Sequence, residues 1–218
     1  MTKYVDVVCY DPYPATFDDS PTEFVYDIMS LAKRTIRKPC YALLQAFEWR
    51  DYFPTTNELR HMWYQAAIAG ANGYGYYAIY DAKYANNKAV PLFDTELWPG
   101  IIDFNKNEVP NIISHFNQGE YEKFNSLNEE DYMYYSFEKG DDIYLIILRM
   151  DATKTSDRNE LPDMEVTIPL KSYDNSKVIG SFTATAIAGG QGEVVTGNGQ
   201  LIHSLKWRQA VLYKISHK

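Results

Sequence analysis

The sequence predicts an α/β segment built on a parallel sheet, followed by an all-β segment. Two observations support this prediction. Between residues 5 and 82, nearly continuous apolar runs alternate with stretches of helical periodicity. From residue 131 onward, short β-rich runs are separated by Gly, Asp, Asn and Pro. We therefore expect two domains, residues 1–120 and residues 127–218, joined by a polar connector.

Three strands are predicted in the α/β segment, and they begin the stretches 5–14, 40–49 and 73–81. Because helices alternate with them, they should lie parallel and be joined by right-handed crossovers. Each stretch ends in a cluster of polar and aromatic residues. Ligand sites of parallel α/β sheets lie at the carboxyl ends of the strands, so a binding site is expected there.

Two amphipathic helices separate these strands. The first follows Ser20-Pro-Thr-Glu23, which offers an N-cap, a first-turn proline and a capping-box glutamate. Its predicted apolar stripe comprises Phe24, Ile28, Leu31, Ala32 and Ile36. The second follows the capping box Thr55-Thr-Asn-Glu58 and ends at Gly70. Its predicted stripe comprises Leu59, Met62, Trp63, Ala66 and Ala67.

A third helical stretch, residues 95–116, is interrupted near Pro110 and is predicted to add a last outer helix to the α/β segment. Its residues Trp98, Ile102 and Phe104 are the predicted contacts with the next domain. That domain is predicted to be an antiparallel β-sandwich. Its expected strands cover residues 132–137, 143–148, 164–168, 178–185, 193–196 and 210–215.

Composition excludes several classes of function. The 218 residues carry a formal net charge of −8, whereas nucleic-acid-binding proteins need a basic face. Cys9 and Cys40 are poorly placed to bridge and are expected to be buried thiols. The four histidines show no ligand spacing, so we expect neither a metal nor a cofactor. No signal peptide or membrane-length apolar run is present, so we expect a soluble protein that binds no membrane.

Four motifs in fixed order carry a resemblance to a known family. They are Asp11-Pro-Tyr-Pro14, Leu44-Gln-Ala-Phe-Glu-Trp49, the helix from Thr55 to Ala66, and Gly70-Ala-Asn-Gly-Tyr-Gly-Tyr-Tyr77. This order resembles the last three βα units of a glycoside hydrolase of the TIM-barrel type. The β domain resembles the small sandwich that often follows such barrels. The resemblance implies a partial (β/α)8 barrel, about strands 6–8 only, and a carbohydrate as the ligand.

The resemblance also implies which residues carry the site. Such hydrolases use two carboxylates, and the acid/base of strand four would lie outside this chain. Gln45 stands at the usual nucleophile position of strand seven and cannot ionise, so it is expected to hydrogen-bond a sugar hydroxyl. Glu48 is the nearest carboxylate and the candidate catalytic residue; the alternative is a solvated loop glutamate. Asp11 and Asp81 are candidate sugar contacts, although Asp11 could instead cap the turn before Pro12.

Aromatic residues gather at the same strand ends and offer flat faces for pyranose rings. The group comprises Tyr10, Tyr13, Phe47, Trp49, Tyr52, Phe53 and Tyr80. Tyr13 and Trp49 are the predicted stacking platforms, and Tyr80 is a further candidate sugar contact. Because the chain holds 19 tyrosines, some of this clustering is expected by chance, and part of it should be core.

Two classes of function therefore stay open. The first is the C-terminal portion of a glycoside hydrolase-like protein that acts on or binds a glycan and is not catalytically competent alone. The second is a non-catalytic carbohydrate-binding or protein-interaction module. In either case, three parallel strands leave one sheet face and two edges uncovered. We expect a homo-oligomer or an association with a missing N-terminal barrel half.

Overall fold

A computed structural model describes residues 5–14, 24–50, 52–85, 88–115, 124–128, 132–150, 161–170, 182–189, 193–194 and 200–217. The described residues divide into two compact units, with the division at residue 108. Each unit has a sheet and a buried core of its own. None of the described helices combines the length and the hydropathy that a membrane span requires.

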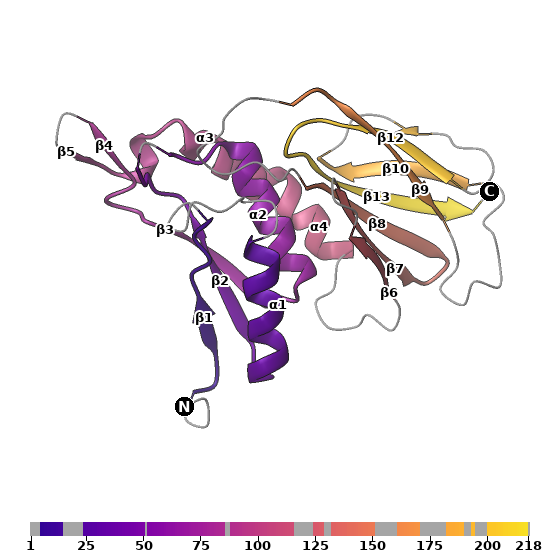
Figure 1. Ribbon diagram of the computed structural model, residues 1–218, viewed down its shortest axis with the longest axis horizontal. Coiled ribbons are helices and arrows are strands. Elements are labelled where there is room, and N and C mark those ends of the chain that lie inside the picture. The colour runs from indigo at the N-terminus through magenta and orange to yellow at the C-terminus, as the bar shows by residue number, and fades with distance from the viewer. Residues whose placement is uncertain are drawn as a thin grey trace. The chain divides into compact units, whose positions relative to one another are not determined.

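The first unit contains a three-stranded parallel sheet in the order β1-β2-β3 (Figure 1). The strands are β1 (Val8–Tyr10), β2 (Cys40–Gln45) and β3 (Gly73–Tyr77). Two helices connect them, α1 (Phe24–Ile36) and α2 (Thr56–Ile68). Val8 pairs with Cys40, and Tyr41 pairs with Gly73. The predicted alternation of parallel strands and helices is confirmed.

Helix α2 forms as its local sequence predicts. The Thr55 hydroxyl accepts a hydrogen bond from the Glu58 backbone N–H at 3.3 Å. The Glu58 carboxylate accepts one from the Thr55 backbone N–H at 2.8 Å. This capping box satisfies two backbone donors at the helix start. All five residues of the predicted apolar stripe are buried, and the Trp63 ring contacts Tyr74 and Phe104.

Helix α1 buries a stripe that shares only Ala32 with the predicted one. Val25, Met29 and Ala32 are buried, at helical spacings of four and three residues, whereas Leu31 is 58% exposed. Leu31 lies about 200° around the helix from Met29, at about 100° per residue, and so points away from the sheet. The predicted cap, Ser20 to Glu23, lies outside the described residues.

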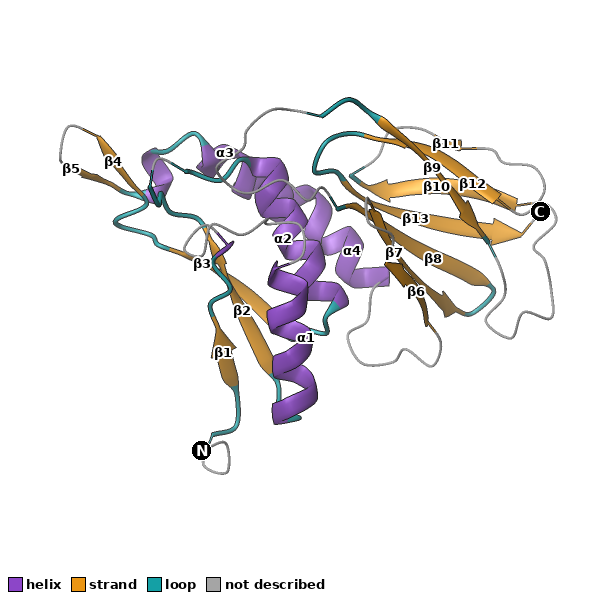
Figure 2. Cartoon of the chain, viewed as in Figure 1, coloured by secondary structure: helices purple, strands orange, loops and turns teal. Residues whose placement is uncertain are grey.

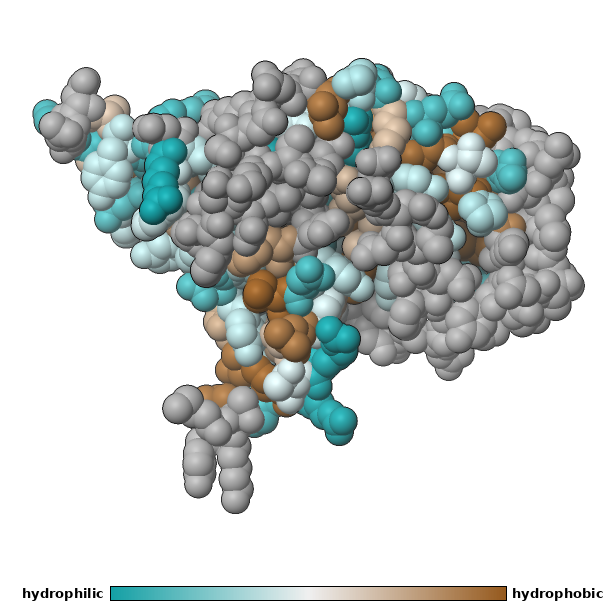
Figure 3. All heavy atoms as spheres, in the orientation of Figure 1, coloured by the Kyte–Doolittle hydropathy of each residue, from teal (hydrophilic) through white to brown (hydrophobic). Residues whose placement is uncertain are grey.

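Both helices lie on one side of the parallel sheet (Figure 2). Cys40, Ala42 and Leu44 point to that side and are fully buried. Successive strand residues point to opposite faces, so Tyr41 and its β1 partner Cys9 lie on the other face, where both are exposed. The exposure of Cys9 corrects the expectation of two buried thiols; both cysteines are free. Hydrophobic residues are visible over the region of β1 and α1 (Figure 3).

The segment after β3 begins with a hairpin, β4 (Lys83–Ala85) and β5 (Lys88–Val90). Helix α3 (Leu97–Asp103) then packs against α2. A π-helical turn at Phe104–Glu108 separates α3 from α4 (Val109–His115). The helical stretch is therefore interrupted at Phe104–Glu108, a few residues before Pro110, where the interruption was predicted. Pro110 itself is the second residue of α4, where a missing backbone N–H is tolerated.

The predicted single outer helix is thus two helices in different units. Helix α4 contacts strand β10 of the second unit. Among the three residues predicted to contact the β domain, Phe104 is buried against Trp63 within the first unit. Ile102 is exposed, and Trp98 is half-buried.

The second unit is antiparallel. One sheet has the order β11-β10-β13-β8-β7-β6, and β12 pairs with β9 in a second sheet. The strands are β6 (Phe124–Asn128), β7 (Tyr132–Lys139), β8 (Asp142–Arg149), β9 (Met164–Pro169), β10 (Phe182–Ala188), β11 (Glu193–Val194), β12 (Gln200–Leu205) and β13 (Ala210–His217). Leu145 and Val211 of the first sheet share one buried cluster with Val166 and Leu201 of the second. Strands β6 and β12 were not predicted.

Candidate functional site

Three aromatic rings meet just beyond the carboxyl ends of the parallel strands. Tyr13 follows β1, Phe47 follows β2, and Tyr77 ends β3. The rings of Tyr13 and Tyr77 are stacked, with centroids 5.8 Å apart and an interplanar angle of 24°. Phe47 presents its ring edge-on, 5.0 Å from Tyr13 and 5.8 Å from Tyr77. We call these three residues the strand-end cluster.

A backbone hydrogen bond fixes the strand ends that carry the cluster, and one of its three rings is exposed to solvent. The backbone N–H of Ala46 donates to the Tyr77 carbonyl at 2.6 Å, which joins the ends of β2 and β3. The Tyr77 side chain is nevertheless 52% exposed. Burial and the nearby charge of Asp11 raise the pKa of Tyr13 to about 12. The Tyr13 hydroxyl therefore stays neutral and able to donate a hydrogen bond near pH 7.

Gln45, the last residue of β2, supports this site from beneath. It is fully buried, and its side-chain amide donates to the Phe47 carbonyl at 3.2 Å. This contact holds the backbone of the loop that carries the Phe47 ring. Asp11 is exposed and lies two residues before Tyr13.

Glu48 has a more specific environment than a solvated loop residue. Its backbone N–H donates to the Ala82 carbonyl at 2.6 Å. Its carboxylate accepts a hydrogen bond from the backbone N–H of Tyr84 at 3.1 Å. Glu48 therefore joins the loop after β2 to the start of the β4–β5 hairpin through both its backbone and its side chain.

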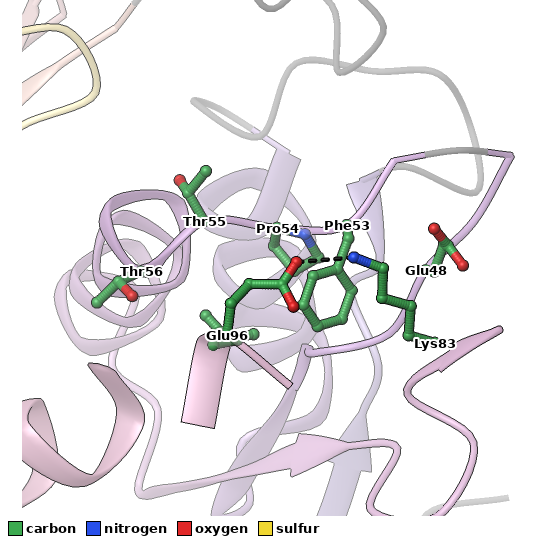
Figure 4. Close-up of a pocket in the computed structure, with 8 residues that line it drawn as sticks. Glu48, Phe53, Pro54, Thr55, Thr56, Lys83 and Glu96 are labelled. Atoms are coloured by element: carbon green, nitrogen blue, oxygen red, sulfur yellow. Dashed lines mark hydrogen bonds and ion pairs between the residues drawn. The ribbon is translucent and has the colours of Figure 1, made fainter. Parts of the chain in front are cut away.

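The Glu48 side chain lines a cavity of about 320 Å³, which we call the Glu48 cavity (Figure 4). The cavity is lined by Glu48, Phe53, Pro54, Thr55, Thr56, Lys83, Glu96 and Leu97. The Lys83 ammonium lies 2.7 Å from a Glu96 carboxylate oxygen and 5.1 Å from the centre of the Phe53 ring. The hydrogen bond from Lys83 lowers the pKa of Glu96, so this carboxylate is charged near pH 7.

The remaining predicted aromatic residues differ in exposure. Tyr52 and Phe53 are buried and belong to the core. Trp49 is 41% exposed, and its backbone exchanges hydrogen bonds of 2.8 and 2.9 Å with Tyr52. Tyr80 is 76% exposed in the turn region between β3 and β4. Asp81 is exposed as well and lies four residues beyond the end of β3.

Sequence reasoning missed Tyr77, Lys83 and Glu96. Tyr77 could have been found, because it lies in the predicted aromatic stretch 73–81, and the structure ends β3 at this residue, in register with Gln45. Lys83 and Glu96 carry no such signal, since Lys83 begins β4 and Glu96 precedes α3, and only the fold of the segment between them brings their side chains together. Within the ranges that the structure describes, no group of three His, Cys, Asp or Glu side chains could hold a metal ion.

Comparisons with known proteins give no family for this chain. No family model matches the sequence, and no curated protein matches it. The solved structures to which it is similar are glycoside hydrolases. They include the α-amylase of Geobacillus thermoleovorans complexed with acarbose, at 15% identity and a TM-score of 0.49 over 88% of this chain and 43% of that one. A 4-O-α-L-rhamnosyl-β-D-glucuronidase from Fusarium oxysporum shows 13% identity and a TM-score of 0.49 over 97% and 54% of the two chains.

A family 30 xylanase from Clostridium acetobutylicum shows 7% identity and a TM-score of 0.42 over 84% of this chain and 44% of that one. The chain thus spans about half the length, or less, of the three enzymes named. Similarity at these TM-scores assigns no activity to this chain.

Proposed function

We propose that the chain binds a carbohydrate at the carboxyl ends of β1, β2 and β3, and that it does not hydrolyse glycosides by itself. The observation that carries this proposal is the strand-end cluster, whose Tyr77 ring is half exposed where the three parallel strands end. An aromatic ring combines a flat apolar face with, in tyrosine, a polar tip. The apolar face of a pyranose ring and its hydroxyls match these two features.

The absence of turnover follows from the carboxylates at this edge. Hydrolysis by the common mechanism needs an acid with a raised pKa and a second carboxylate on the other side of the bond. Gln45 cannot ionise. Glu96 has a lowered pKa, which is opposite to the requirement for a general acid. Glu48 is hydrogen-bonded to the backbone of the neighbouring hairpin. We therefore assign Glu48 to binding.

The chain is, on this proposal, the C-terminal portion of a glycoside hydrolase-like protein. Strands β1–β3 correspond to the last three strands of a (β/α)8 barrel, and the second unit corresponds to its trailing β-sandwich. The parallel order of β1–β3 with both helices on one face supports the first assignment. The cluster shared by two antiparallel sheets supports the second.

A glycan microarray probed with the full chain tests the proposal. Wild type should bind a subset of neutral glycans, and Tyr77→Ala should lose that binding. Tyr41→Ala is the matched control: Tyr41 is 45% exposed on the same sheet, but it lies at the amino end of β2, away from the site. A blank array for wild type, or equal loss in both variants, would show that the strand ends are not a sugar site.

A further inference from the structure

We infer that the Glu48 cavity binds one uncharged sugar unit through a pair of neighbouring hydroxyls. This inference rests on the proposed function and names the chemistry that a second subsite would recognise. Glu48 directly follows Phe47 of the strand-end cluster, so the loop after β2 carries one residue of the cluster and one residue of the cavity.

The cavity offers hydrogen-bonding capacity that the described residues do not use up. The Glu48 carboxylate has about four lone-pair positions, and the hydrogen bond from the Tyr84 backbone N–H occupies one of them. The Lys83 ammonium has three N–H donors, of which the ion pair with Glu96 uses one. In a pair of neighbouring hydroxyls, one can donate to Glu48 while the other accepts from Lys83.

These groups are held in place before a ligand arrives. Glu48 is fixed by hydrogen bonds from its own backbone to Ala82 and from Tyr84 to its carboxylate. Lys83 is fixed by Glu96 and by the Phe53 ring beneath it (Figure 4). Preorganised polar groups lose less conformational entropy on binding, which favours a small ligand with few contacts.

Size and charge narrow the ligand class. A cavity of about 320 Å³ has the volume of about ten water molecules in the liquid, which leaves room for a single sugar ring. Its lining carries two carboxylates against one ammonium, and the whole chain carries a net charge of −8. A uronate or a sulfated sugar would meet net repulsion in this cavity. The cavity is therefore selective for an uncharged glycosyl unit.

The test uses the full chain and saturation-transfer NMR with simple probes. The probes are the methyl glycosides of glucose, galactose, mannose and xylose, with methyl glucuronide as the anionic comparison. Glu48→Gln keeps the shape of the side chain but removes its charge, and Lys83→Met keeps its length but removes all donors. Lys88→Met is the control, because Lys88 is exposed on β5 of the same hairpin.

At least one neutral methyl glycoside should bind wild type and Lys88→Met equally. Its affinity should fall about tenfold or more in Glu48→Gln and in Lys83→Met. Tyr77→Ala should retain this monosaccharide binding while it loses binding to the array. Thermal melts of all variants separate loss of the ligand from loss of the fold.

Three results would overturn the inference: no neutral glycoside binds wild type, binding is unchanged in both cavity variants, or the glucuronide binds as well as the neutral probes. If either of the first two occurs while Tyr77→Ala still abolishes array binding, the cavity only anchors the hairpin and the proposed function stands. Equal binding of the glucuronide would remove the selectivity for an uncharged sugar and would also leave the proposed function standing. A blank array with intact monosaccharide binding would instead remove the strand-end cluster from the site.

Discussion

At the scale of single residues, Glu48 combines a structural role with the binding role that we propose for it. Its hydrogen bonds to Ala82 and Tyr84 hold the hairpin that brings Lys83 into the cavity. A nucleophile would need an open path to an anomeric carbon and a second carboxylate as its partner. Glu96, the other carboxylate of the cavity, is ion-paired with Lys83 and has a lowered pKa, so it does not serve as that partner.

We therefore predict that the full chain does not hydrolyse nitrophenyl glycosides. The release of nitrophenol from a panel of α- and β-glycosides should not exceed that from a boiled sample, and Glu48→Gln should give the same result. Turnover by wild type that disappears in Glu48→Gln would contradict the assignment of Glu48 to binding.

His203 and Tyr213 form the second informative contact at this scale. The His203 Nδ1 atom lies 2.8 Å from the Tyr213 hydroxyl, and Tyr213 is fully buried. Burial lowers the pKa of His203, so the folded protein binds this proton less readily than the unfolded chain. The resulting contribution to stability is present above the unfolded pKa of about 6.5 and is lost as the pH falls through the lowered folded value.

Replacement of this histidine should flatten the acid side of the stability profile. Between about pH 7 and about pH 5, the melting temperature of wild type should fall more than that of His203→Gln. The measurement is a series of thermal melts at constant ionic strength. Parallel profiles for the two proteins would mean that His203 titrates alike in the folded and unfolded states.

At the scale of elements, helix α2 depends on its capping box. Thr55→Ala removes the hydroxyl that accepts from the Glu58 N–H and should lower the free energy of unfolding of the first unit by about 1 kcal/mol. Thr55→Ser retains the acceptor and should stay close to wild type. Urea unfolding of both variants checks this, and an equal loss of stability in the two would assign the effect to the Thr55 methyl group.

Predictability from the sequence also differs from element to element. The capping box and buried stripe of α2 were predicted because every interaction involved is local or follows a helical period. The division between α3 and α4 was not, since a π-helical turn and two separate units decide where each helix packs. The Glu48 cavity was missed for a related reason: Glu48 and Glu96 are far apart in sequence and meet only through tertiary structure.

At the scale of the whole molecule, the sheet face opposite α1 and α2 carries the exposed Tyr41, and Val7, which directly precedes β1, is exposed as well. Exposed apolar surface of this kind favours association. We predict that the chain self-associates at micromolar concentration and that Val7→Asp shifts it toward the monomer. Light scattering coupled to gel filtration measures the mass. A monodisperse wild-type monomer that binds no hydrophobic dye would contradict the prediction.

The second unit should fold without the first. Its two antiparallel sheets share a buried cluster that comprises only residues of that unit. We predict that residues 108–218 give a cooperative thermal transition and bind no glycan on the array, as a support module would. Specific glycan capture by this fragment would move the carbohydrate site into the second unit.

The most direct test of the account is the affinity of the full chain for the glycan that the array selects, measured by isothermal titration calorimetry. Tyr77→Ala should weaken binding by about tenfold or more, equivalent to about 1.4 kcal/mol or more. Tyr41→Ala, at the other end of the same sheet, should bind as wild type does. Unchanged affinity in Tyr77→Ala would contradict the claim that the carboxyl ends of β1, β2 and β3 form the carbohydrate site.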